Sequence, residues 1–73
     1  MDAVKIGNRL RCEREKKKKS LRQVSEAVEI SRSALAMYEN GHRIPRDSVK
    51  ARLAKYYGKS ITTLFFADED HLK

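Results

Sequence analysis

The sequence predicts an all-α fold, a compact bundle of five helices that forms one small domain. Helix-breaking residues are rare, since the 73 residues include only one Pro and three Gly. Apolar side chains recur at helical spacing and do not alternate as they would in strands. Residues that commonly cap helix N-termini precede four of the segments; they are Asp2, Ser20, Ser31 and Ser60.

The first predicted helix covers about residues 3–17 and begins after Asp2. Its buried stripe consists of Ala3, Ile6 and Leu10. Charged residues continue this stripe beyond Leu10, so we expect the far end of the helix to be solvated.

Positive charge dominates the chain, because 17 Lys and Arg stand against 10 Asp and Glu, a formal net charge of +7. This balance indicates a polyanionic partner, either nucleic acid or an anionic membrane surface, although a basic soluble surface explains it as well. Consecutive lysines occupy positions 16–19, where the helix dipole favours positive charge. These lysines are explained either by a solvated helix end or by direct contact with phosphate.

Ser20 and Gln23 have the spacing of a capping box, which opens a short second helix. The apolar residues of this helix fall on one face; they are Leu21, Val24 and Val28. Ser31 follows only eleven residues after Ser20 and is a second N-cap candidate. Two helix starts this close leave room for a tight corner and not for a loop.

The third predicted helix covers about residues 32–39 and ends at Asn40-Gly41. At about 100° per residue, one side of it is apolar and carries Ala34, Leu35 and Tyr38. The opposite side carries Arg32, Ser33, Ala36 and Met37. These side chains include no bulky aromatic ring, so this side can enter the major groove of DNA. An ordinary amphipathic surface helix is the alternative, and the tight corner and basic composition argue against it.

The fourth helix is predicted to begin at Ile44-Pro45, with the proline in its first turn, and to end at Gly58. Its apolar stripe consists of Val49, Leu53 and Tyr56. A last short helix follows Ser60, and its expected buried residues are Ile61 and Leu64. The predicted domain is therefore 1–67, followed by an acidic tail at 68–73 that we expect to fray.

Several function classes are disfavoured by the composition. Cys12 is the only cysteine, so no internal disulfide can form, which fits a reducing compartment. No signal peptide or membrane-spanning run is found, and we expect a soluble cytoplasmic protein. His42 and His71 lack partners at metal-ligand spacing, and no phosphate loop or nucleophile motif is present. We therefore expect no enzyme activity, catalytic residue, metal, cofactor or small-molecule substrate.

The stretch SLRQVSEAVEISRSALAMYENG, at residues 20–41, resembles the helix-turn-helix of the Cro/phage-repressor (XRE-like) family. The likeness extends from Ile6 to Phe65, including the segment KSITTLFF. It implies a lambda-repressor-like bundle that binds double-stranded operator DNA as a homodimer. It also implies transcription regulation, with repression the expected outcome, in a prokaryote, phage or mobile element.

Carried over by position, the resemblance assigns base contacts to Arg32, Ser33, Ala36 and Met37, the set that the helical angles also select. Phosphate contacts are assigned to Ser31, Asn40, His42, Arg43, Arg14, Lys19 and Arg22. The resemblance further implies an ion pair between Arg14 and Glu39, which ties the first helix to the third.

The chain departs from the family pattern at three places. Leu21 stands where a phosphate-binding Gln is frequent, and we expect it to pack. Glu29 stands where the corner usually has Gly, so it must accept about 1 kcal/mol of left-handed strain or a different turn. Lys18-Lys19 replaces a usual Gly-Leu, which removes a core contact and adds charge beside the expected DNA.

The sequence is also compatible with other functions. An antitoxin or adaptor with a protein partner would use the apolar end, Leu64-Phe65-Phe66 and Leu72. A nonspecific nucleic-acid binder and a restriction-modification controller protein are further possibilities. The last helix also supplies a candidate dimer interface, formed by Ile61, Phe65 and Phe66.

Overall fold

The computed structural model describes residues 2–67 and forms five helices within that range. They are α1 (Ala3–Lys16), α2 (Leu21–Ala27), α3 (Arg32–Glu39), α4 (Asp47–Tyr57) and α5 (Ile61–Phe65). No strand occurs among the described residues, so the predicted all-α class is confirmed. The acidic tail 68–73, including His71 and Leu72, lies outside the described residues.

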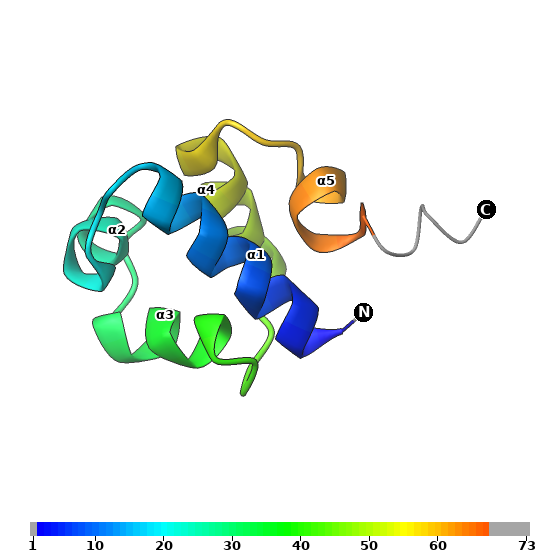
Figure 1. The fold of residues 1–73 in the computed structure, drawn as a ribbon, viewed down its shortest axis with the longest axis horizontal. Coiled ribbons are helices and arrows are strands. Elements are labelled where there is room, and N and C mark those ends of the chain that lie inside the picture. Colours follow the sequence, from blue (N-terminus) through cyan, green and yellow to red (C-terminus); the bar gives the residue numbers. More distant parts are fainter. Residues whose placement is uncertain (1, 68–73) are drawn as a thin grey trace.

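The helices pack around α1, which crosses the middle of the molecule in Figure 1. Helix α1 packs on α3 and α5, while α2 packs on α3 and α4 packs on α5. Helix α3 lies along the lower edge of this view, with one of its long sides turned away from the other helices (Figure 1). The sequence therefore folds so that α3 is held from one side only.

A single apolar core joins all five helices. Its buried members are Ile6, Leu10, Val24, Val28, Leu35, Tyr38, Val49, Leu53, Ala54, Tyr57, Leu64 and Phe65. Leu21, Ile30 and Ala34 pack against this core while remaining partly exposed, as expected for Leu21. Burial of these side chains is the main force that holds helices as short as α2 and α5 in place, because isolated helices of that length are unstable.

The predicted N-caps are confirmed at all four positions. The Asp2 carboxylate accepts from the backbone of Val4 and Lys5, and Ser20 and Gln23 complete the predicted capping box. Ser31 and Ser60 each accept from the backbone N–H three residues later, at 3.0 Å. These bonds satisfy donors that a helix start would otherwise leave open.

Four helices end in the same way, with one residue in the left-handed region and paired hydrogen bonds back into the last turn. Gly41 and Gly58 adopt φ values of 78° and 66°, as their positions after α3 and α4 predict. Lys18 and Glu29 adopt φ values of 56° and 61° after α1 and α2, although neither is glycine. The Ile30 N–H donates to the Ser25 carbonyl at 3.0 Å across the corner between α2 and α3. Glu29 therefore accepts the left-handed strain and keeps the corner tight.

Three expectations from the sequence are wrong. Helix α4 begins at Asp47, because Arg46 is extended (ψ 167°) and acts as its N-cap, so Pro45 precedes the helix. Tyr57 is the buried tyrosine of α4, since it continues the four-residue spacing of Val49 and Leu53, whereas Tyr56 is half-buried. Ile61 is 39% exposed, because the first turn of α5 faces outward.

Candidate nucleic-acid interface

Helix α3 is anchored by its apolar side and by its last residue. Leu35 is completely buried and Tyr38 is 7% exposed, both within the core. Ala34 packs against the same core. This side is the one that the helical angles predict to be buried, and it leaves the opposite side of α3 without any helix packed on it.

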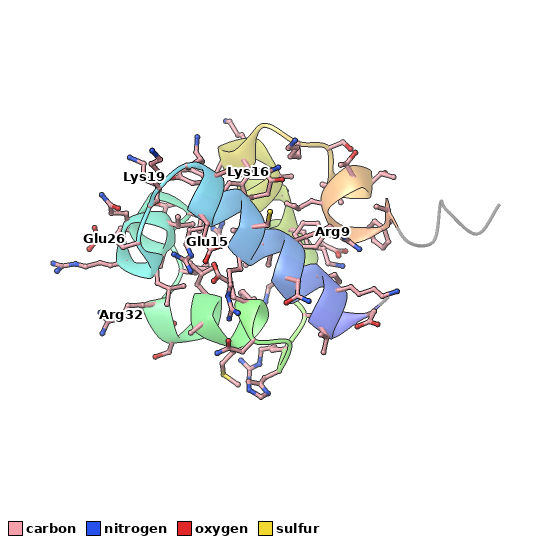
Figure 2. All side chains as sticks on the ribbon, in the orientation of Figure 1. Arg9, Glu15, Lys16, Lys19, Glu26 and Arg32 are labelled. Carbon is pink, nitrogen blue, oxygen red and sulfur yellow. The ribbon has the colours of Figure 1, made fainter. Side chains whose placement is uncertain are left out.

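The solvent side of α3 carries the predicted base-contacting residues. Arg32, Ser33 and Met37 are exposed, and Ala36 is half-buried. Figure 2 shows the Arg32 side chain extending away from the bundle at the start of α3, on the same side of the molecule as Glu26 and Lys19. The arrangement presents a guanidinium, a hydroxyl and small or flexible apolar groups along one accessible helix face.

The Arg14–Glu39 ion pair implied by the resemblance is present and links α1 to the end of α3. Arg14 Nε donates to Glu39 Oε2 at 2.8 Å, and a terminal guanidinium nitrogen donates to Oε1 at 3.0 Å. The Glu39 side chain is only 2% exposed, and that of Arg14 is 16% exposed. Hydrogen bonding to Glu39 raises the pKa of Arg14, whereas its burial acts in the opposite direction. The pair is therefore a charged contact inside the fold.

Arg14 also fixes the segment between α1 and α2. Its remaining terminal nitrogen donates to the Lys19 carbonyl at 2.9 Å. One guanidinium thus joins the last residue of α3 to the backbone just before α2. The geometry gives Arg14 a positioning role, and its predicted phosphate contact stays a prediction.

Arg11 is a positioning residue that the sequence analysis did not identify. One terminal nitrogen donates to Asn40 Oδ1 at 2.6 Å, and Nε lies 3.7 Å from Glu39 Oε1. The bond leaves the Asn40 amide nitrogen available as a donor, which suits the predicted phosphate contact of that residue. The sequence feature that could have identified Arg11 is its helical spacing, because Gly7, Arg11 and Arg14 fall on one face of α1.

Gly7 sets how closely α1 approaches α3. A Cβ at this position would lie 2.4 Å from the Glu39 carbonyl oxygen and 2.6 Å from that of Tyr38. Both contacts involve backbone, so α3 would have to move to admit a side chain. The close approach holds the C-terminal end of α3 at the distance at which Arg11 and Arg14 reach Glu39.

The other predicted phosphate-contacting residues surround α3. Ser31, His42 and Arg43 are exposed at its two ends. Lys19 is exposed before α2, and Arg22 is exposed on α2, where its Nε lies 3.4 Å from Glu26 Oε2. These positions place cationic and hydroxyl groups beside both ends of the accessible helix face.

The candidate dimer residues on α5 do not form one exposed patch. Phe65 is 2% exposed and belongs to the core, so its side chain is not available to a second protomer. The prediction that it forms part of a dimer interface is therefore wrong. Phe66 is half-buried, and Lys50 Nζ lies 5.2 Å from its ring centroid. Ile61 remains the exposed apolar residue of this helix.

The described residues show no sign of metal chemistry or of a membrane span. Within residues 2–67, no group of three or more His, Cys, Asp or Glu side chains is arranged to hold a metal ion. Cys12 is exposed and is a free thiol. Over the same range, every helix is too short or too polar to cross a bilayer.

Two capped helices joined by a tight corner, with the second helix exposed along one side, define a helix-turn-helix DNA-binding domain. A helix-turn-helix family model matches residues 10–64. The chain therefore belongs to this family, of the XRE/Cro type, and the resemblance noted at residues 20–41 is confirmed. Comparison with curated proteins and with solved structures gives no significant match.

Proposed function

We propose that the protein is a sequence-specific transcriptional regulator that binds double-stranded DNA and acts as a repressor. Helix α3 lies in the major groove, where Arg32 donates to a guanine and Ser33 to a neighbouring base edge. Ala36 and Met37 contact thymine methyl groups on the same helix face. Small helix-turn-helix domains are typical of regulators that are not enzymes, and we assign these residues no catalytic role.

The observation that carries this proposal is the one-sided anchoring of α3. Leu35, Tyr38 and Glu39 are buried on one side, while Arg32, Ser33 and Met37 are exposed on the other. A helix held this way can enter a groove without loss of core contacts. The formal net charge of +7 supplies the attraction to the phosphate backbone.

We further propose that the protein binds as a homodimer to two half-sites. One recognition helix contacts only a few base pairs, and two-fold pairing places half-sites about 34 Å apart on one face of the duplex. Ile61 on α5 is one exposed apolar residue that could take part in such pairing. Sedimentation of the protein with a selected palindromic site, and with one half-site, measures the stoichiometry directly.

The proposal is tested by selecting bound sites from a random duplex pool and comparing variants on the winning sequence. Arg32→Ala is expected to weaken binding by about 1–3 kcal/mol and to relax preference at one base pair. Arg43→Ala should weaken all sequences alike and reduce the salt dependence. Unchanged affinity and preference after Arg32→Ala would contradict the assignment of α3 to the groove.

A nonspecific nucleic-acid binder is separated from a regulator by competition with random DNA. A regulator of this size should prefer its site by a factor of about 10³ or more. An antitoxin or adaptor relying on the apolar end is less supported, because Leu64 and Phe65 are part of the core. A restriction-modification controller would behave as a regulator in these assays, and its target genes would distinguish it.

A further inference from the structure

Helices α2 and α4 leave a hollow of about 360 Å³ between them. Its lining residues are Ala27, Val28, Arg52, Lys55 and Tyr56. None of these residues belongs to the set assigned to DNA. The hollow is therefore a second surface feature, separate in its residues from the proposed groove contacts of α3.

The floor of the hollow is apolar, and its aromatic wall is fixed. Ala27 and Val28 contribute small aliphatic groups from the end of α2. The Tyr56 ring packs edge-on against Tyr57, with centroids 5.1 Å apart and planes 70° apart. Lys17 Nζ lies over the Tyr56 ring, 5.3 Å from its centroid. This wall is held before any ligand arrives, which lowers the ordering cost of binding.

The charged residues that line this hollow are all cations. Arg52 and Lys55 line the hollow, and Lys17 lies beside it on Tyr56. Neither Arg52 nor Lys55 forms an ion pair with another described residue, and both are exposed. No carboxylate is among the lining residues. The hollow therefore presents cationic side chains beside an apolar surface.

We propose that this hollow binds an acidic peptide segment of a partner protein, with one apolar side chain of the segment against Tyr56. Carboxylates flanking that side chain pair with Arg52, Lys55 and Lys17, so charge complementarity selects the partner. A nucleic-acid strand fits less well, because its phosphates leave the apolar floor unused.

The test uses two short fluorescein-labelled synthetic peptides, titrated at low salt and followed by anisotropy. Both peptides consist of Asp and Glu around a central pair, which is Leu-Phe in one and Ser-Ser in the other. Burial of the apolar pair should make the Leu-Phe peptide bind at least roughly tenfold more tightly. Amide shifts of labelled protein should move at Ala27, Val28 and Tyr56, and not along α3.

Two charge reversals on the same protein provide the variant and its control. Arg52→Glu should weaken the Leu-Phe peptide by roughly fivefold or more. Arg46→Glu changes the net charge identically, at an exposed position outside the hollow, and should alter binding by less than about twofold. Circular dichroism of both variants establishes that they are folded.

Three results would overturn the proposal. Equal binding of the two peptides would show that only charge matters, and equal effects of the two reversals would show that the hollow is not the site. Displacement of the peptide by a single-stranded oligonucleotide, with shifts at Tyr56, would assign the hollow to nucleic acid. Binding of duplex DNA by the unaltered protein is measured separately, so none of these outcomes decides the proposed DNA function.

Discussion

Replacement of Arg14 by methionine should destabilise the domain by about 3 kcal/mol. The Glu39 carboxylate is 2% exposed and receives two hydrogen bonds from Arg14, at 2.8 and 3.0 Å. Removing one member of a buried ion pair costs about 3–5 kcal/mol, since the other charge is left without a partner. Arg11 lies 3.7 Å from Glu39 and can partly replace the lost cation, which places the expected loss near the lower limit.

Urea denaturation of a double-mutant cycle measures this loss and separates it from packing. Arg14→Met, Glu39→Leu and the double variant are compared with the unaltered protein. The double variant should lose less stability than the two single variants together, because no charge remains buried without a counter-charge. A coupling energy of about 2 kcal/mol is expected. A loss below about 0.5 kcal/mol for Arg14→Met, or no coupling, would refute the reasoning.

Three further changes test the packing, the backbone and the pH response. Gly7→Ala should cost about 2 kcal/mol of unfolding free energy, because its Cβ would lie 2.4 Å from the Glu39 carbonyl oxygen; a melting temperature equal to that of the unaltered protein would contradict this contact. Glu29→Gly should raise the melting temperature by about 4–8 °C by relieving left-handed strain of about 1 kcal/mol, whereas Glu26→Gly, within α2, should lower it. Tyr57→Phe should be at least as stable as the unaltered protein, since the Tyr57 hydroxyl is buried without a hydrogen-bond partner among the described residues. Burial raises the pKa of Tyr57, so the unfolded chain loses the hydroxyl proton at a lower pH than the folded protein does. The free energy of unfolding should therefore decrease above about pH 10. Denaturation at rising pH should show a smaller decrease for the phenylalanine variant.

Helix starts could be predicted from the sequence because their chemistry is local. Ser20, Ser31 and Ser60 cap through their own hydroxyls, and each bond spans only three residues. Two of the helix ends gave a weaker signal, since Lys18 and Glu29 occupy left-handed positions where glycine is the usual marker. Both positions were marked only by the family pattern, in which glycine is usual at the corner and in the first linker.

The exposed face of α3 was predictable because an eight-residue helix has enough turns for its angles to separate two sides. Helix α5 has only five residues, too few for a periodic pattern, and Ile61 and Phe65 were assigned to the wrong environments. Gly7 and Arg11 act on α3 across the interface between helices. Their roles follow from tertiary contacts, and the sequence alone shows only that they share a face of α1.

Methylation protection of a selected site measures most directly whether α3 lies in the major groove. Dimethyl sulfate modifies guanine at N7 in the major groove and adenine at N3 in the minor groove, so one reaction reports on both. The protein should protect guanine N7 within each half-site, and Arg32→Ala should lose protection at one guanine of each half-site while leaving the rest of the footprint. Protection confined to adenine N3, or a footprint unchanged by Arg32→Ala, would contradict the placement of α3 in the groove.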